Sequence, residues 1–230
     1  KTPFILTDFF IPGHFGHNAI WLGTKEQLEE INMWEHPSII PFHEEIKQGK
    51  SLIEAYRPGV RLLSIEEFMD VDEYAIVRHK TVLSDHQVTS EVYRRALNQV
   101  GKDYDFNFDV ETTNVLICSE LIYQSFYNVK WITKKIFGRW TISPDNIMQV
   151  LFKKDTPLEL ISYVTSNKKK EVIRKNILDL AKALHYKAHP SKENEGEFVF
   201  EELDFETEDD LNLLDDEISN LPFDERLTLQ

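Results

Sequence analysis

Apolar residues recur along the first 185 positions in two spacings, one typical of strands and one typical of helices. Short runs of β-branched and aromatic residues predict strands at 4–10, 17–22, 51–56, 74–78 and 158–164. Apolar positions three and four apart predict helices at 24–34, 84–100, 117–127, 143–151 and 168–185, with a shorter helix after residue 64. Strands and helices that are mixed without strict alternation indicate an α+β fold.

Several of these helices begin at residues that commonly cap helix N-termini. Pairs with capping-box spacing occur at Thr24 and Gln27, Ser64 and Glu67, and Ser84 and Gln87. Ser143 precedes Pro144, which suits the first helical position because proline lacks the amide hydrogen. These residues place the predicted helix starts.

The composition is that of a globular protein, with 41% hydrophobic and 29% charged residues in 230. This length fits one domain with an appendage better than two full domains. No apolar run approaches the ~18 residues of a membrane-spanning helix, so no transmembrane segment is expected. The chain begins at Lys1 without a signal-peptide pattern, which suggests a trimmed N-terminus and leaves cell envelope and cytoplasm both open.

The formal net charge of −14 belongs almost entirely to the last forty residues. Residues 191–230 hold fifteen acidic and two basic side chains, and the preceding 190 residues are nearly balanced. A balanced body lacks the clustered cationic surface that nucleic acid requires, so no nucleic-acid partner is expected. The acidic tail carries apolar residues, which leaves both partial order and disorder open, and we expect it to contact the basic segment Lys168–Lys175 or a protein partner.

The single cysteine, Cys118, excludes an internal disulfide and a zinc site built on several thiolates. Its place at the start of a predicted helix favours a thiolate, because free amide groups and the helix dipole stabilise negative charge there. By itself, a lone cysteine at the start of a helix is more often a buried packing residue. The thiol therefore needs a base and an orienting group before it indicates catalysis.

Two polar residues in predicted strands supply candidates for these roles. His17 lies in the predicted strand 17–22, and a sheet would hold its position. A general base needs a fixed position relative to the group it deprotonates. Glu54 stands among apolar residues in 51–56, where a carboxylate is out of place unless it has a partner. If the two strands are neighbours, Glu54 accepts a hydrogen bond from one imidazole nitrogen while the other faces Cys118.

The segments around these residues resemble a known family of hydrolases. The matching motifs are Gly16–Gly23, Ile53–Ala55, Gly59–Val60, Gly101–Asp105, Cys118–Tyr123 and Ser143–Asp145. Together they resemble the YiiX/YebB-like hydrolases, in the circularly permuted branch of the NlpC-type papain-like cysteine hydrolases. Histidine precedes cysteine here, which is the order of that permuted branch.

The resemblance implies a fold and an activity. The fold is expected to be a permuted papain-like α+β fold, with an antiparallel sheet or barrel packed on helices. His17 would be the base, Glu54 the third polar residue and Cys118 the nucleophile of a cysteine hydrolase that cleaves amide bonds, with Tyr104 and Ser119 as substrate-binding residues. The expected substrates are peptides, cell-wall fragments or amino-acid conjugates, and no cofactor is expected.

Other readings stay open beside this one. The same site could hydrolyse or transfer lipid or thioester acyl groups, so a lipid-derived substrate is an alternative, or the fold could be an inactive binding module. His14 and His17 form a His-x-x-His pair, but residues three apart on a strand face opposite sides, so no metal site is expected. The predicted organisation is a hydrolase domain at 1–166, an amphipathic basic helix at 167–190 and an acidic tail at 191–230.

Overall fold

The computed structural model describes residues 13–104, 115–136, 138–167, 171–192 and 196–203. The expected strand at 4–10, Lys168–Lys170 and the acidic tail beyond residue 203 lie outside these ranges. The chain divides into two compact units, one of residues up to 71 with 78–150, the other of 72–77 with residues from 151 onward. Each is a mixture of helices and strands, which confirms the mixed class expected from the pattern.

The first unit is built on a five-stranded sheet in the order β1-β2-β3-β5-β6. Its strands are β1 (Ile20–Trp21), β2 (Leu52–Tyr56), β3 (Gly59–Leu63), β5 (Asp103–Tyr104) and β6 (Val115–Leu116). Neighbours are antiparallel except β5 and β6, which are parallel. Within the described ranges this sheet is open, so the expected barrel is not observed and the expected antiparallel sheet has one parallel pair. A parallel pair cannot be joined by a tight turn, which is why ten residues separate β5 from β6.

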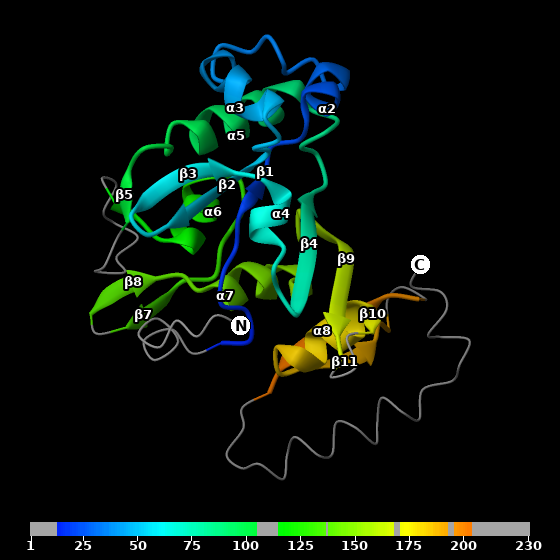
Figure 1. Cartoon of the computed structure of the whole chain (residues 1–230). Helices are drawn as coiled ribbons and strands as arrows, with labels where there is room; N and C mark the ends of the chain where they lie inside the picture. The colour runs from blue at the N-terminus through cyan, green and yellow to red at the C-terminus, as the bar shows by residue number, and fades with distance from the viewer. Residues whose placement is uncertain (1–12, 105–114, 137, 168–170, 193–195, 204–230) are drawn as a thin grey trace. The chain divides into compact units, whose positions relative to one another are not determined.

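Helices and one small hairpin complete this unit (Figure 1). The helices are α2 (Lys25–Glu30), η1 (Ile40–Phe42), α3 (His43–Lys47), α4 (Ile65–Phe68), α5 (His86–Leu97), α6 (Cys118–Ser125) and α7 (Pro144–Gln149). The short helix η2 (Val150–Phe152) begins at the last residue of this unit and continues into the second. The hairpin joins β7 (Lys134–Ile136) to β8 (Arg139–Thr141). Helix α6 packs against β2, α5 and α7, so it runs through the centre of the unit.

The apolar side chains that drive this packing form one cluster between the sheet and the helices. Leu28, Ile39, Ile53, Leu116 and Leu121 have no exposed surface and belong to it. They come from α2, β2, β6, α6 and the loop before η1, so burial of their side chains ties the sheet to the helices. The N-terminal end of α6 is thereby held against the sheet.

Three of the four predicted capping residues cap a helix in the structure. Thr24 with Gln27, and Ser64 with Glu67, form capping boxes, and Ser143 caps α7 with Pro144 next to it. Helix α5 begins one residue later than predicted. Asp85 caps it in place of Ser84, because its Oδ1 accepts hydrogen bonds from the amides of Gln87 and Val88 at 2.9 and 3.2 Å. A carboxylate accepts two such bonds more readily than a hydroxyl does.

The second unit contains a three-stranded sheet in the order β10-β9-β4 and a two-stranded hairpin. Its elements are β4 (Glu73–His79), β9 (Leu158–Ser166), β10 (Val172–Lys175), α8 (Ile177–Ala183), β11 (Tyr186–Pro190) and β12 (Phe198–Glu202). The rings of Tyr186 and Phe200, one from each strand of the hairpin, pack on Phe152 at centroid distances of 4.7 and 4.8 Å.

The expected helix over 168–185 is wrong in its first half. Residues 172–175 form β10, which pairs with β9 through Val172 opposite Ser166, and only Ile177–Ala183 is helical. Two β-branched residues favour the strand, and Asn176 starts a new helix by accepting hydrogen bonds from the amides of Leu178 and Asp179. The basic side chains of Arg174 and Lys175 therefore lie on a strand and not on a helix face.

Gly59, the first residue of β3, allows a close backbone approach on which the sheet depends. A Cβ added there would lie 2.2 Å from the carbonyl oxygen of Lys102, just before β5. We expect Gly59→Ala to lower the free energy of unfolding by about 1–3 kcal/mol, since the backbone would have to move to accept the methyl group. Denaturant unfolding followed by far-UV circular dichroism measures this change.

Gly16→Ala is the matched control for this prediction, because a Cβ at Gly16 has no atom within 4 Å. Its free energy of unfolding should stay within about 0.5 kcal/mol of the parent value. Equal destabilisation by the two substitutions would contradict the close-approach explanation.

Candidate functional site

Cys118 is the first residue of α6, as the sequence predicted. Cys118 is 8% exposed, and the preceding residue, Ile117, has an extended backbone. The buried carboxylate of Glu120 accepts a hydrogen bond from the Ile117 amide at 2.9 Å and so fixes the start of the helix. The thiol therefore lies where the unbonded amide groups of a helix N-terminus are found.

His17 lies just outside the strand in which it was predicted. β1 contains only Ile20 and Trp21, and His17 belongs to the segment that leads into it. The imidazole lies beside two aromatic rings, Tyr56 at a centroid distance of 6.1 Å and Phe68 at 5.7 Å. The His17 side chain is one-third exposed.

Glu54 lies in β2 as predicted and is only 4% exposed. Its Oε2 accepts a hydrogen bond from His17 Nε2 at 3.0 Å. Its Oε1 accepts from Arg61 Nε at 2.9 Å and lies 2.8 Å from Arg61 Nη2. The expected pairing of a buried carboxylate with the histidine is observed, because β1 and β2 are hydrogen-bonded neighbours.

The thiol of Cys118 and the imidazole of His17 interact, and each shifts the pKa of the other. Burial alone lowers the pKa of His17, but the interactions with Cys118 and Glu54 outweigh it and raise this pKa from 6.5 to about 10. Since Nε2 is bonded to Glu54, Nδ1 is the nitrogen left to face the thiol.

The pKa of Cys118 shifts in the opposite direction. Burial raises it, but the positive charge and hydrogen bond of His17 oppose burial, together with hydrogen bonds from the Asn18 amide and from Ser119. The net effect is a lowered pKa of the thiol. Raised imidazole and lowered thiol values favour a thiolate–imidazolium pair.

The pKa of Glu54 is also lowered, although burial acts to raise it. The hydrogen bonds and positive charges of His17 and Arg61 outweigh the burial of the carboxylate. Glu54 is thus an anion that neutralises two cationic neighbours. This arrangement lets a charged imidazole persist in a partly buried place.

Asn18 and Arg61 contribute to this cluster, and sequence reasoning named neither. Asn18 Nδ2 lies 3.5 Å from Ser119 Oγ, and the Asn18 amide helps to lower the pKa of the thiol. Arg61 faces Glu54 directly across the β2–β3 ladder. The sequence could have indicated Arg61. If one strand ends at Tyr56 and an antiparallel partner starts at Gly59, residue 61 lies opposite Glu54.

The two predicted substrate-binding residues occupy different surroundings. Ser119 is completely buried, and its Oγ lies 3.9 Å from Cys118 Sγ. Tyr104 is half-buried in β5, where the guanidinium of Arg57 lies 6.0 Å from its ring centroid. The structure thus places Ser119 beside the thiol and Tyr104 beside Arg57, and their role toward substrate stays a prediction.

The His14–His17 pair does not form the core of a metal site in the part of the chain that the structure describes. No group of three or more His, Cys, Asp or Glu side chains there is arranged to hold a metal ion. His14 is exposed, and its imidazole packs edge-on against Phe15 at 4.9 Å. In the described ranges, no helix has the length and apolar character needed to span a membrane.

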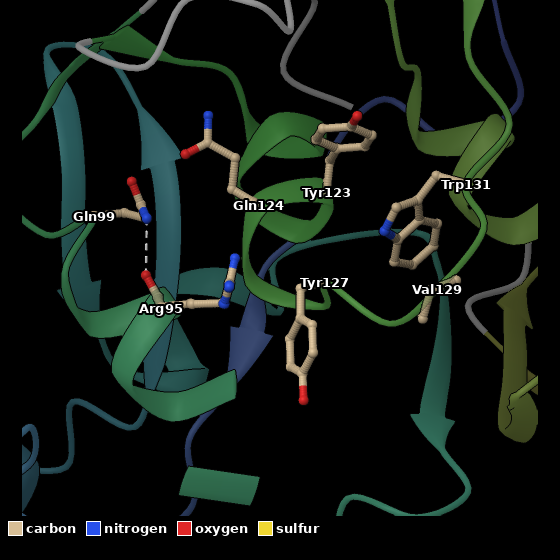
Figure 2. Close-up of a pocket in the computed structure, with 7 residues that line it drawn as sticks. All are labelled: Arg95, Gln99, Tyr123, Gln124, Tyr127, Val129 and Trp131. Carbon is tan, nitrogen blue, oxygen red and sulfur yellow. Dashed lines mark hydrogen bonds between the residues drawn. The ribbon is translucent and has the colours of Figure 1, made fainter. Parts of the chain in front are cut away.

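A cavity of about 450 Å³ lies elsewhere in the same unit (Figure 2). Its lining comes from α5, α6 and the segments after them: Arg95, Gln99, Tyr123, Gln124, Tyr127, Val129 and Trp131. The guanidinium of Arg95 lies 4.6 Å from the ring centroid of Tyr127, and Gln99 donates a hydrogen bond to the Arg95 carbonyl. None of Cys118, His17 and Glu54 lines this cavity, so it is separate from their cluster.

Comparison with known proteins gives one match. The family model described as permuted papain-like amidase enzyme, YaeF/YiiX, C92 family, matches residues 1–179. Searches of curated proteins and of solved structures each gave no match. The matched region includes the segments that carry Cys118, His17 and Glu54.

Proposed function

The chain belongs to the C92 family of permuted papain-like amidases, and from this we propose that it hydrolyses amide bonds with Cys118 as nucleophile, His17 as base and Glu54 as orienting residue. Membership of the family establishes a cysteine hydrolase of the amidase type in general terms. The roles of the three residues and the substrate are the proposed part.

One observation carries this proposal: hydrogen bonds join Arg61 to Glu54 and Glu54 to His17, and His17 and Cys118 interact strongly enough to shift each other's pKa. Nucleophile, base and orienting group in this order are what nucleophilic catalysis requires. The shifts of pKa agree with it, since a structural thiol buried among apolar groups has a raised pKa, whereas Cys118 has a lowered one.

The proposed reaction begins with the thiolate attacking the carbonyl carbon of the amide. The amide group of Cys118, at the first position of α6, is available to the oxygen that becomes negative in the tetrahedral intermediate. The imidazolium of His17 then gives its proton to the leaving amine, and an acyl-thioester on Cys118 remains. Glu54 keeps Nε2 protonated and holds the ring in place throughout.

The same residues release the acyl group, with His17 now acting as a base where it acted as an acid toward the leaving amine. Neutral His17 takes a proton from water, which attacks the thioester and frees the carboxylic acid and the thiol. Amides of peptides, cell-wall fragments or amino-acid conjugates are the proposed substrates, because the family is one of amidases.

Alkylation of Cys118 across pH tests the thiolate–imidazolium pair. Cys118 is the only cysteine, so iodoacetamide incorporation reports on this thiol alone. We expect alkylation to continue well below the ordinary thiol pKa of ~8.5, and the pair to last on the alkaline side until His17 loses its proton near pH 10. Mass spectrometry of the intact chain measures the rate at each pH.

In His17→Ala the midpoint of this profile should return toward ~8.5, where a thiol is only about 0.3% ionised at pH 6. His14→Ala is the matched control, because it removes an exposed imidazole three residues away and should leave the profile unchanged. A parent profile centred at 8.5 or above would show an ordinary packed thiol and would refute the proposal. An acyl adduct of Cys118 after incubation with mixed peptide amides would identify the acyl group.

A further inference from the structure

The carboxylate of Asp145 holds the segment that precedes His17. Its Oδ2 accepts a hydrogen bond from the His14 amide at 2.8 Å, and its Oδ1 accepts one from the Phe15 amide at 2.8 Å. Two short bonds from consecutive amides to the two oxygens of one carboxylate fix both the position and the direction of that backbone.

Gly13 shows how closely this backbone approaches Asp145. A Cβ built on Gly13 would lie 2.7 Å from Asp145 Oδ2 and 3.0 Å from its carboxyl carbon. A side chain at this position would therefore push the carboxylate away from the amides of His14 and Phe15. Because Gly13 has no side chain, the carboxylate of Asp145 can come close enough to accept the two amide hydrogen bonds.

Asp145 lies in the first turn of α7, whose start is capped. It follows Ser143 and Pro144, and the Ser143 hydroxyl accepts a hydrogen bond from the Asn146 amide at 3.2 Å. Asn146 Oδ1 accepts one in return from the Ser143 amide at 3.1 Å. A carboxylate in the first turn of a capped helix is a fixed point from which a neighbouring loop can be oriented.

The segment from residue 13 to 17 needs such support, because His17 lies outside the β1–β2 ladder. The ladder begins only at Ile20. In Figure 1 the blue segment ahead of β1 passes α7 before it reaches the sheet, which agrees with the two bonds to Asp145. On its N-terminal side, the backbone of His17 is thus held through Phe15, two residues away.

We propose that Asp145 is a positioning residue that keeps the imidazole of His17 in register with Cys118. This inference rests on the function proposed above. Asp145 touches neither the thiol nor the imidazole in the described contacts, and it acts through the backbone of His14 and Phe15. Losing these bonds frees the segment and weakens the interaction by which His17 lowers the pKa of Cys118.

The test is the pH profile of Cys118 alkylation by iodoacetamide in Asp145→Ala, Asp145→Asn and Gly13→Ala. Asp145→Ala removes both acceptors, and its midpoint should rise by at least about one pH unit, which is roughly a tenfold loss of thiolate at acidic pH. Asp145→Asn keeps the size and one acceptor oxygen, so a smaller rise is expected. Gly13→Ala disturbs the same contact from the opposite side and should also raise the midpoint.

Asp179→Asn is the matched control. Asp179 also lies in the first turn of a helix, where its Oδ2 accepts from the Asn176 amide at 2.9 Å, but that bond lies within its own cap. This variant should keep the parent profile. Far-UV circular dichroism establishes that each variant is folded at every pH used.

The outcomes separate this inference from the proposed function. If the parent midpoint is low and folded Asp145→Asn and Gly13→Ala both keep it, the positioning role is refuted and the proposed function stands. If the parent midpoint is that of an ordinary thiol, the proposed function itself fails. Lower stability of the Asp145 variants with an unchanged profile would show a purely structural role and would also overturn the inference.

Discussion

Replacing Cys118 by alanine is expected to lower amide hydrolysis by about 10³-fold or more, because the substitution removes the proposed nucleophile. Cys118→Ser should be almost as inactive, since His17 in this site is set to hold a proton beside a thiolate and not to deprotonate a hydroxyl. Release of free amine from a panel of peptide and amino-acid amides measures the rate.

Ser125→Ala controls for damage to the helix that carries the nucleophile. Ser125 is buried on α6, and its hydroxyl bonds the Leu121 carbonyl one turn earlier. Its loss should affect stability and leave the hydrolysis rate within a few-fold. Full activity of Cys118→Ala on any amide that the parent hydrolyses would rule out the thiol as nucleophile.

The second large effect is expected at Glu54. Glu54→Gln keeps the shape of the side chain but removes the charge that stabilises the imidazolium and fixes the tautomer of His17. We expect the hydrolysis rate to fall by about 10²–10⁴-fold, with a smaller change in substrate affinity, since in the proposed mechanism Glu54 acts on His17 and not on the substrate. The same amine-release assay, run over a range of substrate concentrations, separates kcat from KM.

Arg61→Gln provides the comparison for this substitution. Arg61 binds the other oxygen of Glu54, but its side chain is half exposed, so solvent can replace much of its interaction. Its loss should cost less than about tenfold in rate. A loss as large as that of Glu54→Gln would mean that Arg61 takes part in the reaction and does more than support the carboxylate.

The parts of the site that the sequence predicted are those in which local pattern decides position. Cys118 lies at the start of the helix that the apolar spacing predicts over 117–127, and in the structure it is the first residue of α6. Glu54 lies within a short run of strand-forming residues, so its burial in β2 could be expected. In both cases a few neighbouring residues determine the element.

The parts that the sequence did not reveal depend on contacts between distant segments. Asp145 bonds amides about 130 residues away, and no pattern near α7 points to that partner. The position of His17 outside β1 depends on where pairing with β2 stops, which is a property of two strands together. The helix expected over 168–185 is wrong in its first half because Val172 and Ile173 are β-branched, and such residues favour a strand.

The order of the three residues along the chain has a consequence for how the site assembles as the protein is made. His17 and Glu54 are separated by 37 residues, so the base and the carboxylate can meet once β1 and β2 have paired. Cys118 is more than sixty residues further on and is supplied by α6, which packs on a sheet whose first strands precede it. On a chain growing from its N-terminus, Cys118 is the last of the three to be synthesised. A nascent chain that stops before α6 therefore lacks the proposed nucleophile, and Asp145, which we propose to hold the segment before His17, is made later still.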